Sequence, residues 1–308
     1  MFVEEYLKEL REHRYSPPAI AAYVYKCARQ SWNAAQERPA AIRGVVLAGL
    51  VHLVLLFGAS VAISLILDRE LGRDYFVASS LWLAAGLIWV ALHLGMFRHD
   101  RELPLSGLGL PNFLTLGRLL TVPAFYLFIT RGHELLALIA FGVGGLSDVA
   151  DGIAARKLGA VTRLGKIFDP LVDVLFNAVA ALGLTVAGYL PVWLLVLIFL
   201  RYGVLLLGAC WIYVVHGPVR VQPTVLGKAT GVITSGLVFG VVLVHQFLEP
   251  GAAEKVLELL YIALGFVFAL TTVQVVILGV SNIRRIAHGD AGRGPFTMAE
   301  PPRGERGR

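Results

Sequence analysis

Cysteine is scarce in this chain, whose 308 residues include only Cys27 and Cys210. Cys27 lies in a polar N-terminal region, and Cys210 lies in an apolar stretch. Disulfide frameworks and zinc sites need more cysteines, or cysteines combined with histidines at short spacings. The sequence fits neither kind of site, and we expect two unpaired thiols.

Three other features are missing. Residues 1–40 carry charges of both signs and no early apolar core, so we do not expect a secretory signal there. No internal repeat is visible along the chain. The arginines of the C-terminal tail are spread among glycine and proline without interleaved aromatic residues, so nothing indicates binding to nucleic acid.

Apolar residues are abundant instead. They make up 57% of the chain, and the mean hydropathy is +0.72, whereas a soluble domain is about 45–50% apolar. A membrane-spanning helix needs about 20 mostly apolar residues. The sequence therefore predicts an all-α, polytopic transmembrane helical bundle with eight spans. These spans cover residues 44–67, 75–97, 112–131, 134–155, 166–188, 191–214, 226–248 and 255–281.

The basic residues predict the orientation of these spans. The connections between spans fall into two sets, and one set, together with both termini, holds most of the lysines and arginines. The positive-inside rule places that side in the cytoplasm, and eight spans return both termini to it. Beyond the N-terminal region, its basic residues are Arg98, Arg101, Lys157, Arg163, Arg220, Arg284, Arg285, Arg293, Arg303, Arg306 and Arg308.

Four aspartates stand at fixed spacing between two apolar stretches: Asp148, Asp151, Asp169 and Asp173. One aspartate at the centre of a membrane helix costs roughly 2.5–3.5 kcal/mol, so four together imply a bound partner. Spacings of three and four residues place each pair on one helix face. The polar segment between the pairs allows a turn that brings them together. Their oxygen atoms suit one or two Mg²⁺ or Mn²⁺ ions.

Small residues accompany the aspartates. Gly152, Ala155 and Gly165 let a ligand approach the backbone, or let two helices pack closely. Taken singly, each residue favours helix packing. Beside four aspartates, the ligand interpretation gains weight.

Together these residues read D-x2-D-G-x2-A-R-x8-G-x3-D-x3-D, with every position filled. The pattern resembles the signature of the CDP-alcohol phosphotransferases, also called class I CDP-alcohol phosphatidyltransferases. The resemblance covers residues 108–285. It begins with Asn112-x2-Thr115-x2-Arg118 and continues through the run from Pro223 to Lys228.

The resemblance implies a six-helix core whose active site opens to the cytoplasm. The four aspartates would ligate two divalent metal ions, and Asp173 would also take the proton from the acceptor hydroxyl. That oxygen would attack the lipid-bearing phosphorus of a CDP-linked donor such as CDP-diacylglycerol, and CMP would leave. The residues around the nucleotide and its phosphates would be Asn112, Thr115, Arg118, Gly152, Ala155, Arg156 and Gly165.

The choice of acceptor rests on finer likenesses. Asp169-Pro170 and the run from Leu226 to Lys228 resemble the bacterial phosphatidylglycerophosphate synthase and cardiolipin synthase branches. We expect glycerol 3-phosphate first. Arg201, inside an apolar helix, would bind its phosphate with help from Arg220 and Lys228. The alternative role of Arg201 is that of a structural partner to an aspartate.

Departures from the glycerol-phosphate branch favour phosphatidylglycerol as the alternative acceptor. That branch usually has glutamate where Tyr202 stands, a second arginine where Gly208 and Ala209 stand, and lysine where Val174 stands. A pocket with fewer cations suits a bulkier acceptor. A cation-binding transporter is a candidate from another class, but it would show two related halves, which we do not find.

On this basis the chain divides into four parts. Residues 1–42 form a cytoplasmic amphipathic region, which either meets lipid or is an ordinary helix pair. Residues 43–105 add two N-terminal spans, residues 106–286 form the catalytic core, and residues 287–308 form a disordered basic tail. We expect a protein of a bacterial-type inner (plasma) membrane, and the family typically forms homodimers.

The two added spans contain histidines and tryptophans. His52 and His93, one in each span, are expected to be hydrogen-bonded membrane histidines rather than metal ligands. Trp82 and Trp89 are expected to pack against other helices or to anchor the interface.

Overall fold

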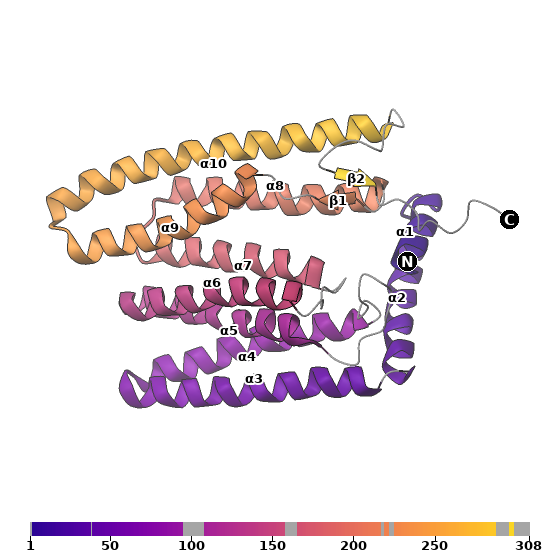
Figure 1. Ribbon diagram of the computed structural model, residues 1–308, viewed down its shortest axis with the longest axis horizontal. Coiled ribbons are helices and arrows are strands. Elements are labelled where there is room, and N and C mark those ends of the chain that lie inside the picture. The colour runs from indigo at the N-terminus through magenta and orange to yellow at the C-terminus, as the bar shows by residue number, and fades with distance from the viewer. Residues whose placement is uncertain are drawn as a thin grey trace. The chain divides into compact units, whose positions relative to one another are not determined.

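The computed structural model describes residues 2–37, 39–94, 108–157, 165–216, 219–221, 225–287 and 296–298. Within these residues the chain forms ten helices and two short strands (Figure 1). The helices are α1 (Phe2–Glu12), α2 (Pro17–Glu37), α3 (Pro39–Ile66), α4 (Arg69–Leu92), α5 (Leu110–Thr130), α6 (Glu134–Lys157), α7 (Gly165–Val186), α8 (Val192–His216), α9 (Val225–Phe247) and α10 (Pro250–Ala287). The strands are β1 (Val219–Val221) and β2 (Phe296–Met298).

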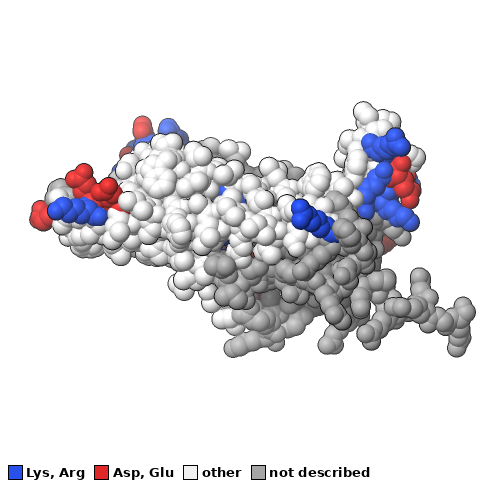
Figure 2. All heavy atoms as spheres, turned by 90° about the horizontal axis from the view of Figure 1, so that it is seen from above, with Lys and Arg blue, Asp and Glu red and all other residues white. Residues whose placement is uncertain are grey.

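Eight of these helices, α3 to α10, are long and apolar enough to cross a membrane. The prediction of a polytopic all-α membrane protein is confirmed, and each predicted span coincides with one helix apart from its ends. Figure 2 shows charged side chains mainly toward the two ends of the face in view, with mostly uncharged atoms between them. This distribution is that of a multi-pass membrane protein, whose apolar middle faces lipid.

The chain divides into two compact units. The first, called the site unit here because it carries the aspartates, contains Cys27–Pro191 and Val241–Leu248. The second unit contains Met1–Lys26, Val192–Gly240 and Glu249–Arg308.

Helix α5 is the central element of the site unit. Of its most apolar 18-residue window, 61% is buried, whereas no other candidate span exceeds 33%. A glycine lets α6 approach it closely, because a Cβ added at Gly144 would lie 2.8 Å from Thr121 Oγ1 and 2.7 Å from the ring of Phe176. Side chains on α5 therefore meet those of α6 and α7 at short range.

Local sequence signals set the ends of these helices. Asp68 caps α4 by accepting a hydrogen bond from the backbone N–H of Leu71 at 2.9 Å. Gly109 precedes α5 with a φ of +74°, a conformation that glycine adopts without steric cost, and Pro111 lies in the first turn. The first turn of α5, which carries Asn112, is thus defined by its sequence.

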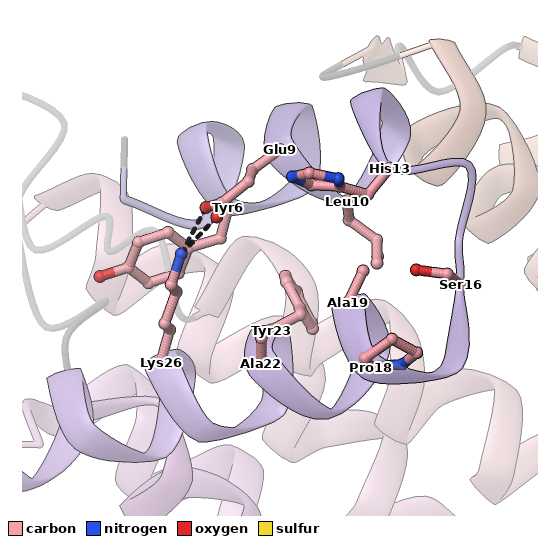
Figure 3. Close-up of a pocket in the computed structure, with 10 residues that line it drawn as sticks. All are labelled: Tyr6, Glu9, Leu10, His13, Ser16, Pro18, Ala19, Ala22, Tyr23 and Lys26. Atoms are coloured by element: carbon pink, nitrogen blue, oxygen red, sulfur yellow. Dashed lines mark hydrogen bonds and ion pairs between the residues drawn. The ribbon is translucent and has the colours of Figure 1, made fainter.

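In the second unit, α8 packs on α10, where a Cβ at Gly265 would lie 2.6 Å from the ring of Trp193. The N-terminal helices also leave a pocket of about 230 Å³ (Figure 3). At its edge, Lys26 donates to Glu9 at 2.6 Å, which lowers the pKa of that carboxyl. Helix α2 begins at Pro17, where proline is favoured because the first turn of a helix does not need its backbone N–H.

Strand β2 pairs antiparallel with β1, with Arg220 opposite Thr297. The strand lies in the tail for which the sequence predicts disorder, so that prediction does not hold at Phe296–Met298. Pairing supplies partners for backbone groups that the composition of the tail alone does not provide. The rest of the predicted tail, beyond Ala287, lies outside the described residues.

Candidate functional site

The site is built on one face of α5, which we call the front face: Asn112, Thr115 and Arg118. Residues three apart lie on the same side of a helix, and all three side chains are buried. The Asn112 side chain donates to the carbonyl of Leu108 at 2.6 Å, which ties it to the start of the helix. Thr115 and Arg118 point to the aspartates of α6 and α7.

Arg118 is the centre of the aspartate cluster. Its Nη2 atom lies 2.9 Å from Asp148 Oδ1 and 2.6 Å from Asp151 Oδ2, and its Nη1 atom pairs with Asp173. One guanidinium group thus contacts three carboxylates from two helices. The predicted meeting of the two aspartate pairs takes place in the structure, and a side chain from a third helix lies between them.

The fourth carboxylate joins through a hydroxyl group. Thr115 Oγ1 lies 2.9 Å from Asp169 Oδ1 and 3.3 Å from Asp151 Oδ2. Asp169 is thereby linked to the same cluster without touching the guanidinium. All four predicted aspartates gather around Thr115 and Arg118.

The cluster is closed on one side and open on the other. The side chain of Asp151 is 5% exposed, while those of Asp148 and Asp173 are 50% and 44% exposed. The buried carboxylate faces α5, and the two exposed ones form the accessible edge. A ligand can therefore reach Asp148 and Asp173 without displacing a helix.

The oxygen donors of the cluster suit a hard divalent cation. Carboxylate oxygens are the ligands that Mg²⁺ and Mn²⁺ prefer, and the cluster offers no nitrogen or sulfur ligand that would select a softer metal. Among the described residues, no group of three or more carboxylates, imidazoles or thiols is arranged around a common metal position. Arg118 supplies the positive charge at this place, and its buried Nε atom has no hydrogen-bond partner there.

The structure also places the other predicted site residues. Gly152 in α6 and Gly165 at the start of α7 lie in the helices that carry the aspartates. Arg201 lies in the second unit, buried in α8 beside the rings of Tyr202 and Phe268, whose centroids are 5.4 and 5.8 Å from its guanidinium carbon. Four more belong to described elements, but their side chains lie outside the described part: Ala155 and Arg156 in α6, Arg220 in β1 and Lys228 in α9.

Sequence reasoning missed the pairing of Arg118 with the aspartates, since the resemblance assigned this residue to the nucleotide. The spacing of Asn112, Thr115 and Arg118 carried the signal, because it places all three on one helix face. A buried arginine on such a face needs a counter-charge, and a carboxylate on a neighbouring helix can supply it. The contact of α4 with α7, described below, had no such signal.

Comparisons with known proteins point to one family. Residues 108–278 match the family model described as CDP-alcohol phosphatidyltransferase. A "Cardiolipin synthase (CMP-forming)" of Streptomyces coelicolor is 34% identical over 128 residues, which are 40% of this chain and 59% of that protein. A "Probable phosphatidylglycerophosphate synthase" of Mycobacterium tuberculosis is 39% identical over 98 residues, which are 30% of this chain and 47% of that protein.

A third relative carries a further name. A "CDP-diacylglycerol--glycerol-3-phosphate 3-phosphatidyltransferase" of Aquifex aeolicus is 38% identical over 78 residues, which are 25% of this chain and 44% of that protein. The chain thus spans between 44% and 59% of the length of these three relatives. No solved structure matches.

Proposed function

We propose that this chain, which belongs to the CDP-alcohol phosphatidyltransferase family, transfers a phosphatidyl group from CDP-diacylglycerol to an alcohol acceptor and releases CMP. The family model matches more than half of the chain, so the predicted family is confirmed. The observation that carries the proposal is the gathering of four aspartates from α6 and α7 around the front face of α5.

The family generally uses divalent metal ions, and the oxygen donors described above fit such ions. We propose that Asp148, Asp151, Asp169 and Asp173 hold two of them, Mg²⁺ or Mn²⁺. When bound, the ions would neutralise the charge of the diphosphate that is being broken. Arg118, already among the carboxylates, adds a fixed positive charge next to the same phosphates.

Asp173 is the proposed general base. Its carboxylate lies at the accessible edge of the cluster, so an acceptor hydroxyl can reach it. The acceptor oxygen bonds to the phosphatidyl phosphorus, the bond from that phosphorus to the CMP oxygen breaks, and the hydroxyl proton passes to Asp173. Around the nucleotide we place Asn112, Thr115, Arg118, Gly152, Ala155, Arg156 and Gly165.

Glycerol 3-phosphate is the proposed acceptor, with phosphatidylglycerol as the alternative. Relatives with both corresponding names match the chain at similar identity. Arg201, assisted by Arg220 and Lys228, would bind the phosphate of the acceptor. Phosphatidylglycerol is favoured by one observation: the ring of Tyr202, where the glycerol-phosphate branch has glutamate, packs beside Arg201.

The arrangement in the membrane completes the proposal. The chain is a multi-pass membrane protein, and we propose that the site and both termini face the cytoplasm of a bacterial-type cell. That side is where a soluble nucleotide product leaves. We also propose a homodimer, on the sole ground that homodimers are typical of the family.

The deciding experiment measures CMP release from CDP-diacylglycerol by the purified chain with Mg²⁺. The acceptors are glycerol 3-phosphate, phosphatidylglycerol, inositol phosphate and serine, and Asp173→Asn is the control. Release with one acceptor, reduced at least about 10³-fold in the variant, establishes the reaction and names the acceptor. A folded, metal-binding protein that releases no CMP with any of them contradicts the proposal and returns weight to a cation transporter.

A further inference from the structure

The added spans α3 and α4 pack on the side of α5 that faces away from the aspartates. We call this side the back face: Phe113, Leu116 and Gly117. Each of these residues is adjacent in sequence to one of the front-face residues, and because neighbours on a helix are about 100° apart, the three lie on a different side of α5. Figure 1 shows α3, α4 and α5 side by side.

Helix α3 meets the back face through a buried histidine. The His52 ring lies 4.3 Å from the ring of Phe113, centroid to centroid, and its Nδ1 atom lies 2.7 Å from the carbonyl oxygen of Ala48. Its Nε2 atom would lie 3.2 Å from a Cβ added at Gly117, so the glycine leaves room for the imidazole. The prediction of hydrogen-bonded membrane histidines describes His52 well.

Helix α4 approaches α5 as closely as a glycine allows. A Cβ added at Gly86 would lie 2.5 Å from Leu119 and 3.2 Å from Leu116, distances at which the neighbouring side chains must shift. The backbone of α4 is therefore in close contact with α5 at this point. One turn further along α4 stands Trp89.

Trp89 connects α4 to the helix that carries two of the aspartates. Its ring stacks on Phe168 at 4.9 Å with an interplanar angle of 15°, and on His93 at 4.4 Å and 28°. Phe168 is 2% exposed and directly precedes Asp169. The stack thus fixes the first turn of α7, one residue away from a carboxylate of the site.

That turn has a specific need for side-chain support. Pro170 follows in the second turn of α7 and cannot donate a backbone hydrogen bond to the first turn. The orientation of Asp169 therefore depends more on the packing of Phe168 than it would in an uninterrupted helix.

We infer that the two spans ahead of the family-matched residues position the carboxylate site, with Trp89 and Gly86 as positioning residues. Trp89 sets the first turn of α7, and Gly86 sets the depth of α5, so together they fix the distance between the aspartates and Arg118. The inference rests on the proposed function. A supporting residue of this kind acts on metal affinity and turnover without touching the substrate, typically by about 10–100-fold.

The test measures Mn²⁺ affinity by electron paramagnetic resonance of the purified full chain, together with kcat and KM for CMP release. We expect Trp89→Leu to weaken Mn²⁺ binding about 10-fold and to lower kcat, with KM for the acceptor unchanged. Trp89→Phe keeps an aromatic stack and restores most of the affinity. The matched control is Trp82→Leu, which lies two turns earlier on the same face of α4 and leaves both quantities at wild-type values.

A second pair of variants covers the case in which Trp89→Leu does not fold. Gly86→Ala adds a single methyl group against Leu119 and is expected to weaken Mn²⁺ binding several-fold. Its control, Gly58→Ala in α3, places the same methyl group where nothing lies within 4 Å. Wild-type Mn²⁺ affinity in every folded variant at positions 86 and 89 overturns the inference.

The failure of the proposed function gives a different result. In that case the wild-type protein releases no CMP, and any Mn²⁺ it binds is bound equally well by Asp173→Asn. If the wild-type protein is active and binds Mn²⁺, and the variants at positions 86 and 89 have the same Mn²⁺ affinity and kcat, the proposed function stands. Only the positioning role is then overturned.

Discussion

Among the residues that the structure describes, two arginines are buried in membrane-spanning helices, and their surroundings differ. Arg118 in the site unit contacts Asp148, Asp151 and Asp173. Arg201 in the second unit is 6% exposed and lies beside two aromatic rings, with no carboxylate within ion-pair distance among the described residues. One cation is surrounded by negative charge and the other is not.

The difference indicates that Arg118 and Arg201 have different roles. A buried cation with three carboxylate partners neutralises charge that the fold itself has brought together. Arg201 has aromatic neighbours and no carboxylate partner among the described residues, so its guanidinium can still take an anion. Under the proposed function we assign that anion to the phosphate of the acceptor, so the two arginines are expected to respond differently to removal.

The largest effect is expected for Arg118→Ala. Removing the guanidinium leaves the buried carboxylate of Asp151 facing two others with no counter-ion, which costs about 3–5 kcal/mol for a broken buried pair. The thermal unfolding temperature in detergent should fall strongly in EDTA and recover in Mg²⁺, because a divalent ion replaces the lost charge. CMP release falls in both conditions.

Arg131→Ala is the matched control for this prediction. Arg131 pairs with Asp74 at 2.9 Å, but the two side chains are 44% and 31% exposed, so the pair is worth about 1 kcal/mol or less. If the two variants unfold at the same temperature in EDTA, Arg118 is not the counter-ion of the cluster. The proposed difference in role between Arg118 and Arg201 is then wrong.

Arg201→Ala is expected to have a smaller effect on stability and a selective one on catalysis. No described carboxylate pairs with Arg201, so its removal leaves no buried carboxylate without a counter-ion, and the cost to folding should be small. The KM for the phosphate-bearing acceptor should rise at least about 10-fold, with the KM for CDP-diacylglycerol unchanged.

Arg201→Lys sharpens the same prediction, because it keeps the charge and loses the planar pair of donors. Its acceptor KM should lie between those of wild type and Arg201→Ala. A collapse of the fold in Arg201→Ala, comparable to that of Arg118→Ala in EDTA, would instead assign Arg201 a structural role.

Much of the fold followed from composition. Eight apolar stretches of about 20 residues can only be spans when the backbone must satisfy its hydrogen bonds internally, and the helices coincide with them. Local chemistry also fits the start of α2 at Pro17, since proline suits the first turn of a helix. The pairing of β2 with β1 did not, because it depends on a partner about 75 residues away in the sequence, beyond the reach of local pattern.

The site was predictable where spacing carries geometry. Aspartates three and four residues apart share a helix face, and the cluster of Asp148, Asp151, Asp169 and Asp173 follows once the two helices pack. Arg118 was expected beside the nucleotide; its spacing from Asn112 and Thr115 places it on their face of α5, but which helices pack on that face is not encoded by spacing. The stack of Trp89 on Phe168 joins residues of separate helices for the same reason.

The smallest expected effect on stability concerns the hydrogen bond between Glu134 and an uncharged partner, Tyr189. Tyr189, in the connection after α7, donates a hydrogen bond to Glu134 at 2.7 Å; burial, followed by this bond, raises the pKa of Tyr189 to about 12. Tyrosine in an unfolded chain titrates near pKa 10. The folded protein therefore keeps a proton that the unfolded chain loses between these values, and the stabilisation is complete below about pH 10 and is lost as the pH rises toward 12.

Replacing the hydroxyl tests this sign directly. Tyr189→Phe should lower stability by about 1 kcal/mol at neutral pH, the loss expected for one partly exposed hydrogen bond. Because the variant has no proton to lose at this position, its unfolding temperature should fall less than that of wild type between about pH 9 and pH 11. Equal losses in the two proteins would show that Glu134 does not hold the Tyr189 proton. The contrast would then be that the charged donor Arg118 binds its carboxylates strongly, whereas the neutral donor Tyr189 does not.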